Sequence, residues 1–218
     1  MAQQYIEDFP EELDSIQDLI NAKQYQEGLN LLNTFLKEKA NFPQAVLLKA
    51  ETLRDLDKNT QAYEWYQKAI QLAPKWVKAY ERYGSALTHD GYWQEAYDLY
   101  NTALKKMPQV ADLYFSRATV ARLLEKFDQS LNDYTEAIKL EKNQKKPMPE
   151  ALQLYYLRRA YLWQELKNYD QALLDLNAMI QVDPNNHNNY NIRASFYINN
   201  FEDYAKALPD YEKALVLA

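Results

Sequence analysis

Few side chains in this sequence could carry out chemistry on a substrate. The 218 residues include no cysteine and only two histidines, His89 and His187, which stand 98 residues apart. Thiol catalysis, disulfides and cysteine-ligated zinc are therefore excluded, and a two-histidine metal site or a paired acid–base role is disfavoured. The sequence also contains no phosphate-binding loop, nucleophile elbow or dinucleotide fingerprint. We expect no enzymatic activity, no cofactor and no bound metal.

Three arginines and three aspartates recur in matched positions. Each arginine directly precedes an alanine, and the aspartate follows 16 or 17 residues later: Arg117 with Asp133, Arg159 with Asp175, and Arg193 with Asp210. The equivalent earlier positions hold Lys49 with Trp65, and Tyr83 with Leu99. The two charges thus occur together or not at all. This predicts an ion pair between two helices, with a structural role rather than a role in ligand binding.

The composition favours a helical protein. There are 19 tyrosines but only 3 glycines, whereas strand-rich folds with tight turns and glycine-rich phosphate loops need more glycine. The formal net charge of −6 disfavours a dedicated nucleic-acid binder, because phosphate contacts need a surplus of lysine and arginine. We therefore expect no nucleic-acid partner.

Targeting signals are not visible in the sequence. The first residues contain no basic region followed by an apolar run, and the apolar stretches are too short to cross a membrane. We expect a soluble, cytoplasmic protein without membrane insertion, although a chain from which an export signal had been trimmed would look the same.

Small residues recur along the chain at a period of 34. Intervals of 34, 34, 34, 42 and 35 residues separate the members of one series: Gly28, Ala62, Ala96, Ser130, Ala172 and Ala207. A large residue follows each member four positions later, and a second series of small residues lies twelve or thirteen positions ahead: Ala50, Gly84, Ala118, Ala160 and Ala194. Prolines close several units, at Pro74, Pro108 and Pro184. The pattern predicts two antiparallel helices per unit, whose backbones approach closely at the small residues and whose second helix ends at the proline.

This pattern resembles the tetratricopeptide repeat family, most closely in WVKAYERYGSALTHDGYWQEAYDLYNTALKKMP, residues 76–108. The resemblance implies an all-α fold, a right-handed α-solenoid superhelix of six helix–turn–helix repeats. We expect a tail at 1–8 and then a single solenoid domain at 9–218. The expected repeats are approximately 9–42, 43–76, 77–110, 111–144 with a linker to 152, 153–186 and 187–218.

In this family the first helices of successive repeats line a concave groove in which extended peptides lie. The resemblance therefore implies a protein–protein interaction adaptor or scaffold whose partner is another protein or peptide. Helical periodicity places nine candidate peptide-binding residues on this face: Lys78, Arg82, His89, Phe115, Arg122, Arg158, Tyr161, Asn188 and Asn191. The four lysine and arginine residues among them suit an acidic peptide or a carboxylate terminus. The alternative for each is an ordinary solvated side chain.

One subgroup of the family grips chaperone C-termini with a two-carboxylate clamp. Lys78 and Arg82 match the basic half of that clamp, but Asp14 and Leu48 stand where its asparagines are expected. A full clamp is therefore not predicted.

Three irregularities break the period. Eight extra residues fall in 142–150, as a tolerated surface insertion or as a basic contact loop. One extra residue in 199–203 predicts a bulged turn. Pro209 is expected to kink the last helix or to delay its start. Since no polar helix follows to cover the last pair, either the sequence belongs to a longer protein or another chain covers this pair. The alternative function is thus a self-assembling scaffold that forms a homo-oligomer through its C-terminal helix pair.

Overall fold

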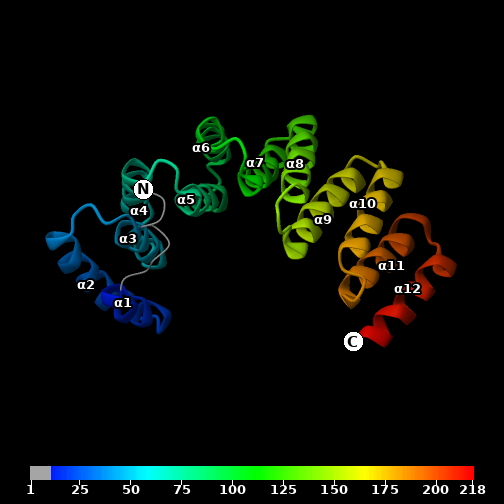
Figure 1. The fold of residues 1–218 in the computed structure, drawn as a ribbon, viewed down its shortest axis with the longest axis horizontal. Coiled ribbons are helices and arrows are strands. Elements are labelled where there is room, and N and C mark those ends of the chain that lie inside the picture. The colour runs from blue at the N-terminus through cyan, green and yellow to red at the C-terminus, as the bar shows by residue number, and fades with distance from the viewer. Residues whose placement is uncertain (1–10) are drawn as a thin grey trace. The chain divides into compact units, whose positions relative to one another are not determined.

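The computed structural model describes residues 11–218, and this part of the chain contains twelve α-helices and no strand (Figure 1). The helices follow one another in six pairs: α1 Glu11–Asn21 and α2 Tyr25–Glu38; α3 Pro43–Asp55 and α4 Asn59–Leu72; α5 Val77–His89 and α6 Trp93–Lys106; α7 Ala111–Leu123 and α8 Phe127–Lys142; α9 Pro149–Glu165 and α10 Tyr169–Val182; α11 His187–Phe201 and α12 Tyr204–Leu217. The predicted all-α class with six helix–turn–helix repeats is confirmed. The expected tail and the expected start of the first repeat at Phe9 lie outside the described residues.

Packing divides the chain into two compact units, and the boundary along the chain falls between Pro108 and Gln109. In unit 1 each of α1 to α5 packs against the next helix along the chain, and in unit 2 the same is true of α7 to α11. Each unit therefore has the nearest-neighbour architecture of a repeat protein. The continuity of a single solenoid over 9–218 stays a prediction.

The turn inside each helix pair contains one residue in the left-handed backbone region. The six residues recur with the period of the sequence repeat: Lys23, Asp57, Gly91, Glu125, Lys167 and Glu202. In the second repeat, the next N–H, that of Lys58, donates to the carbonyl of Leu53 over 2.9 Å, five residues back. The carbonyls of the last helical turn have no partner within the helix, and this bond satisfies one of them. The first helix therefore ends here, and the chain reverses into the second helix.

The small residues of the sequence repeat lie at the helix crossings. Ala62, Ala96 and Ala172 are fully buried. Only glycine fits at position 84, because a Cβ atom on Gly84 would lie 2.3 Å from the ring of Tyr100. The buried Ser130 adds a polar link, since its hydroxyl donates to the carbonyl of Ala118 over 2.7 Å. These contacts explain why small residues alternate with large aromatic ones along the chain.

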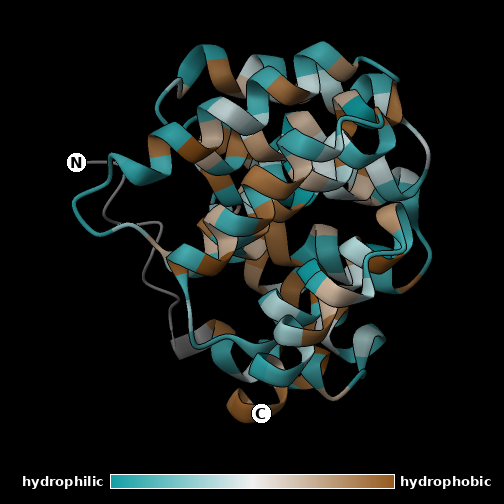
Figure 2. Ribbon diagram, turned by 90° about the vertical axis from the view of Figure 1, so that its right-hand side faces the viewer, coloured by the Kyte–Doolittle hydropathy of each residue, from teal (hydrophilic) through white to brown (hydrophobic). Residues whose placement is uncertain are grey.

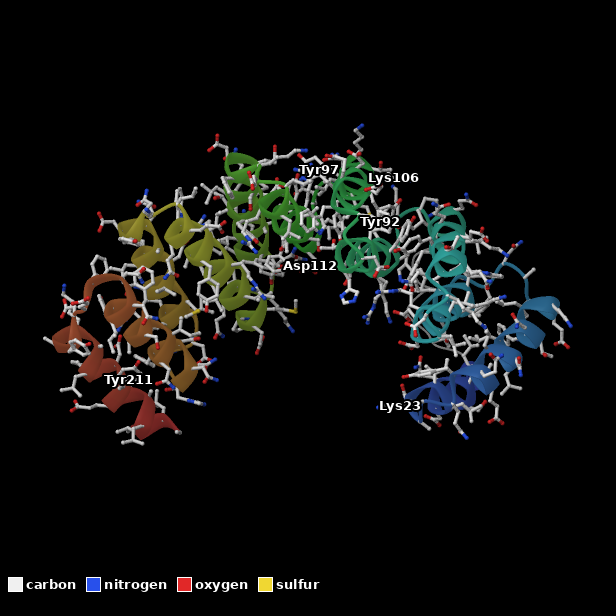
Figure 3. The ribbon with its side chains drawn as sticks, turned by 180° about the vertical axis from the view of Figure 1, so that it is seen from behind. Lys23, Tyr92, Tyr97, Lys106, Asp112 and Tyr211 are labelled. Atoms are coloured by element: carbon white, nitrogen blue, oxygen red, sulfur yellow. The ribbon has the colours of Figure 1, made fainter. Side chains whose placement is uncertain are left out.

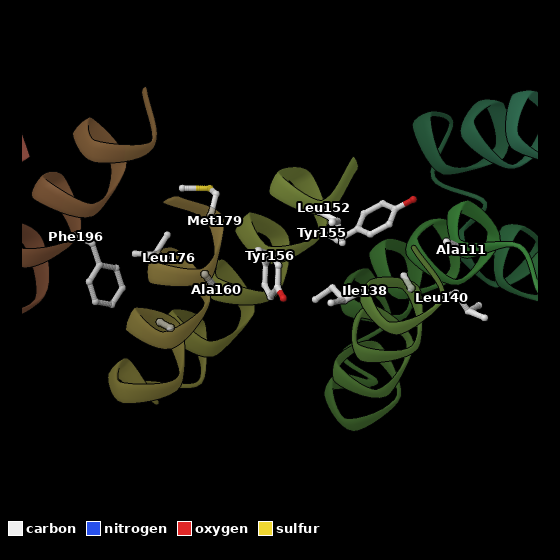
Figure 4. Packing of buried hydrophobic residues seen from close by; sticks show 12 residues of the cluster. Ala111, Ile138, Leu140, Leu152, Tyr155, Tyr156, Ala160, Leu176, Met179 and Phe196 are labelled. Carbon is white, nitrogen blue, oxygen red and sulfur yellow. The ribbon is translucent and has the colours of Figure 1, made fainter. Parts of the chain in front are cut away.

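The core of unit 2 joins successive repeats. Buried residues from α7 to α11 pack in one cluster that includes Tyr155, Tyr156, Leu176 and Met179 (Figure 4). Colouring by hydropathy shows hydrophilic and hydrophobic residues interleaved along the helices, with a hydrophobic last turn at the C-terminus (Figure 2). Most of the stabilisation of this unit is expected from such apolar burial between neighbouring helices.

The insertion after the fourth repeat is divided between two longer helices and a short loop. Helix α8 continues to Lys142, and α9 begins at Pro149, four residues before the expected start of the fifth repeat. Residues 143–148 are exposed. The buried carboxylate of Glu141 accepts a hydrogen bond from the backbone N–H of Met148 over 2.6 Å, which ties the end of the loop to α8.

The last turn is wider than the others, as predicted. Helix α11 runs to Phe201, and the N–H of Asp203 reaches back six residues to the carbonyl of Tyr197, over 3.2 Å. Pro209 was expected to kink the last helix or to delay its start; the delay is wrong, and the kink stays a prediction. Helix α12 already begins at Tyr204 and contains Pro209, because the side chain of Asp203 caps it by accepting from the N–H of Lys206.

Candidate functional site

The three predicted arginine–aspartate ion pairs are all present and join the two helices of the last three repeats. Each guanidinium donates two hydrogen bonds to one carboxylate: Arg117 to Asp133 over 2.8 and 2.7 Å, Arg159 to Asp175 over 2.9 and 2.6 Å, and Arg193 to Asp210 over 2.8 and 2.6 Å. The aspartate side chains are only 3, 5 and 8 % exposed. The hydrogen bond to Asp210 also raises the pKa of Arg193. These arginines therefore join the two helices of a repeat and are not free to bind a ligand.

In the second repeat a different interaction occurs at the positions equivalent to the arginine and the aspartate. The ammonium of Lys49 lies 3.6 Å from the centre of the Trp65 ring, and Lys68 lies 4.7 Å from it. This is a cation–π contact. Burial lowers the pKa of Lys49, and the charge of Lys68 adds to that effect. The sequence pattern put Lys49 and Trp65 in paired positions, but it did not reveal this contact.

Unit 1 contains an open hollow of about 550 Å³ on the side of its first helices. Five charged residues line it together with polar and apolar ones: Lys23, Glu51, Arg54, Asp55 and Arg82. Of the nine predicted binding residues, only Arg82 lies here. Its Nε is 3.1 Å from a carboxylate oxygen of Glu51, whose pKa is raised by burial. The charge of Arg82 is thus offset, and the hollow has a mixed rather than a basic character.

Unit 2 contains a second open hollow, of about 560 Å³, between α9 and α11. Three predicted residues, Tyr161, Asn188 and Asn191, line it. The remaining lining residues were not among the predicted binding residues: Gln164, Ile192, Ser195, Phe196 and Asn199. None of these eight is a lysine, arginine, aspartate or glutamate. The unit 2 hollow is therefore uncharged, unlike that of unit 1.

The other five predicted residues lie outside the residues that line the two hollows. Lys78, His89 and Arg158 are exposed. Phe115 is half-buried, because its ring packs 4.9 Å from that of Tyr155, measured between centroids.

Arg122 is tied to another side chain, since it donates to a carboxylate oxygen of Glu165 over 3.0 Å. Two of the four predicted cations, Arg82 and Arg122, therefore have carboxylate partners.

Helix α12 carries an exposed apolar face, and Tyr211 on this helix is marked in Figure 3. Tyr204 is 67 % exposed and Leu215 is 80 % exposed, and Leu208 and Tyr211 are also exposed.

Thirty-five residues earlier, in α10, the positions equivalent to this face are occupied by Tyr169, Leu173, Leu176 and Ile180. All four pack in or against the core. The α12 face thus has the chemistry of a surface that another helix covers in the preceding repeat.

In residues 11–218 no three histidine, aspartate or glutamate side chains are grouped so that they could hold a metal ion. No helix of that part combines the length and apolar character needed to cross a membrane.

Comparison with known families and structures identifies the architecture. Models of the tetratricopeptide repeat match residues 13–75 and residues 111–144. A search of curated proteins gave no significant match.

Several solved structures share the fold. MamA from Desulfovibrio magneticus RS-1, residues 41 to its end, aligns with a TM-score of 0.63 at 14 % identity, over 79 % of this chain and 93 % of that one. YrrB, described as a TPR protein with an unusual peptide-binding site, aligns with a TM-score of 0.55 at 22 % identity, over 85 % and 91 %. Yeast Tom70 aligns with a TM-score of 0.64 at 20 % identity, over 89 % of this chain but only 39 % of its own.

Proposed function

Because the chain is built of tetratricopeptide repeats, we propose that it is a protein-interaction scaffold that holds an extended peptide segment of its partner against the first helices of its repeats. Repeats of this kind are typically interaction modules rather than enzymes. The observation that carries the proposal is the hollow between α9 and α11, which is open, lies on first helices and includes three of the predicted binding residues. The description of YrrB as a protein with a peptide-binding site supports the same function.

We further propose that the bound segment has acidic residues. Lys78 and Arg158 are exposed, and within the described residues neither has a carboxylate within ion-pair distance. Both can therefore pair with a ligand carboxylate at little cost. Arg82 and Arg122 contribute less to this preference, because Glu51 and Glu165 already neutralise them.

Fluorescence anisotropy with labelled peptides tests this preference. Peptides that contain several Asp or Glu residues should bind more tightly than versions with Asn and Gln, and their affinity should fall as salt rises, because exposed charge pairs are screened. Lys78→Glu and Arg158→Glu should each weaken the acidic peptides severalfold. Lys105→Glu is the matched control, since Lys105 is an exposed lysine on a second helix, α6. Equal binding of acidic and neutral peptides would contradict the acidic preference.

The exposed face of α12 favours a second candidate function, self-association through the C-terminal helix pair. In this case, a helix of a second copy covers Leu208 and Leu215, whose equivalents in α10, Leu173 and Ile180, pack in or against the core. Light scattering over a concentration series should then show a dimer, and Leu208→Asp with Leu215→Asp should convert it to a monomer. A chain that is monomeric at every concentration would eliminate this candidate.

A further inference from the structure

The second repeat carries two positive charges at a place where the last three repeats are neutral. In those repeats a buried aspartate on the second helix balances the arginine on the first. In the second repeat Trp65 stands at the aspartate position. The ammonium of Lys49 lies 3.6 Å from the centre of its ring and that of Lys68 lies 4.7 Å from it. Since an indole has no charge, both cations lack the anion that the later repeats supply.

No carboxylate replaces the missing aspartate. Among the residues that the structure describes, neither Lys49 nor Lys68 forms an ion pair. Glu64 precedes Lys68 by one helical turn, but the ammonium of Lys68 lies over the Trp65 ring instead. Burial and the charge of Lys68 both lower the pKa of Lys49, and no acidic group of the described part of the chain raises it. The two charges are therefore unbalanced, in a protein whose net charge is −6.

The polar groups at this place can only donate hydrogen bonds. An ammonium has three N–H donors and an indole has one, and neither group has an acceptor atom. The indole N–H of Trp65 has no hydrogen-bond partner within residues 11–218, and it is not one of the buried unpaired groups of that part, so it is open to solvent. The ligand that fits this set is an anion with several acceptor oxygens.

A phosphoryl group matches these donors better than a carboxylate does. It carries a charge of about −1.5 to −2 at pH 7 and three strong acceptor oxygens. It can therefore balance two ammoniums and also accept from the indole N–H. A carboxylate carries a single negative charge, so one ammonium would remain unbalanced. Because lysine has a flexible four-carbon stem, both ammoniums can turn toward one anion.

These three side chains lie apart from the hollow of unit 1. Lys49 on α3, and Trp65 and Lys68 on α4, are half-buried, and none of them lines that hollow. Arg159, which is equivalent to Lys49, donates to the hydroxyl of Thr135 on the preceding second helix over 2.8 Å. By this equivalence Lys49 points to the side of the second helices, away from the first-helix face on which the proposed peptide lies.

From these contacts we propose that Lys49, Lys68 and Trp65 form a binding site for a phosphoryl group, on the side of the second helices of unit 1. The site goes beyond the proposed peptide-binding function, and either can exist without the other. The same group occurs in free phosphate and in a phosphorylated side chain of a partner protein. The test separates these two sources.

The test uses the intact chain and three probes: inorganic phosphate, a peptide with one phosphoserine among neutral residues, and the same peptide without the phosphoryl group. Fluorescence anisotropy of the labelled peptides, with inorganic phosphate as competitor, measures affinity. Proton–nitrogen NMR spectra locate the site, because the indole N–H of Trp65 gives a signal of its own.

Four variants accompany the probes. Lys49→Met and Lys68→Met each remove one charge but keep an unbranched side chain. Trp65→Asp places a carboxylate where the later repeats have one, so that the protein itself neutralises Lys49. Lys105→Met is the matched control, because Lys105 is an exposed lysine on another second helix, α6. The melting temperature of each variant verifies that it remains folded.

Both phosphate-containing probes should shift the indole signal of Trp65, and the peptide without the phosphoryl group should not. Lys49→Met and Lys68→Met should each weaken binding about three- to tenfold, the range expected for one charged hydrogen bond. Trp65→Asp should abolish binding, and Lys105→Met should leave it unchanged. If the phosphopeptide binds much more tightly than inorganic phosphate, the ligand is a phosphorylated partner. Similar affinities identify the free anion, and both results support the site.

Two results would overturn the proposal. If neither phosphate-containing probe shifts the Trp65 signal at millimolar concentration, the site does not exist. If the phosphopeptide binds but Lys49→Met and Lys68→Met bind it as well as the natural chain does, the phosphoryl group is held elsewhere. Binding of acidic peptides through Lys78 and Arg158 is measured separately, so the proposed function stands in either case.

Discussion

Two different kinds of side-chain pair join the two helices of a repeat in this chain. In the last three repeats an arginine on the first helix grips a buried aspartate on the second, and in the second repeat Lys49 lies on the ring of Trp65 instead. In both arrangements a cation on the first helix interacts with a side chain on the second helix. The two arrangements differ in how much stability is lost when the cation is removed. An aspartate without its arginine is a buried charge, whereas a tryptophan without its lysine is still a good apolar residue.

Arg159→Ala tests the importance of the ion pair. The carboxylate of Asp175 would remain buried without its partner, so the free energy of unfolding should fall by about 3–5 kcal/mol. Urea denaturation followed by circular dichroism measures this loss. Arg158→Ala, at the exposed neighbouring position, should change stability by less than about 0.5 kcal/mol. A marked loss of peptide binding with unchanged stability in Arg159→Ala would contradict the structural role.

At this scale the sequence predicted some contacts and missed others for clear reasons. The arginine–aspartate pairs could be predicted, because both charges appear and disappear together at fixed spacing. The partners of Arg82 and Arg122 were missed, because Glu51 and Glu165 come from other repeats and follow no period. Glu51 and Asp55 are one helical turn apart, and this was the signal that the wall near Arg82 is not simply basic.

The turn inside each helix pair contains one residue in the left-handed backbone region. Five of the six left-handed positions hold residues other than glycine, with φ between 54° and 63°. Such a conformation costs roughly 1–2 kcal/mol for a residue with a Cβ atom. Natural packing and the hydrogen bonds of the turn compensate for this cost.

Substitutions at these turns should therefore change stability in opposite directions. Lys167→Gly should raise the free energy of unfolding by about 1 kcal/mol, because glycine adopts the left-handed region without strain. Gly91→Ala should lower it by a similar amount, although a Cβ atom there meets nothing within 4 Å. Thermal unfolding by calorimetry measures both. A neutral Gly91→Ala would show that the turn relaxes its backbone.

The helices themselves were largely predictable, because small residues, large residues and prolines all mark the same period. The ends of the helices were less predictable. The insertion was expected as a surface insertion or a basic contact loop. It extends both α8 and α9, since Pro149 is well suited to the first turn of a helix. The start of α12 was not predicted: Asp203 caps the helix by accepting a hydrogen bond from the N–H of Lys206, and Pro209 lies further along the same helix.

The molecule as a whole consists of two units that are each stabilised internally. All three arginine–aspartate pairs and the cluster that contains Tyr155 and Leu176 lie within unit 2. Repeat proteins depend on contacts between neighbouring repeats, and three repeats are enough for a continuous core.

A fragment of residues 109–218 should therefore fold without unit 1. It should show a helical circular dichroism spectrum and a cooperative urea transition of its own. A fragment of residues 125–218, which lacks α7 and with it Arg117, is the control and should be clearly less stable. An unfolded 109–218 fragment would mean that unit 1 is needed to complete the core.

The short loop between α8 and α9 has a practical consequence. Its residues 143–148 are exposed, and its anchoring hydrogen bonds lie at its two ends, at Asn143, Gln144 and Met148. Since the natural chain contains no cysteine, a cysteine in place of Lys145 would be its single thiol. A fluorophore attached there would be away from the helix crossings, and it would report on events in unit 2 from a position that does not line the unit 2 hollow.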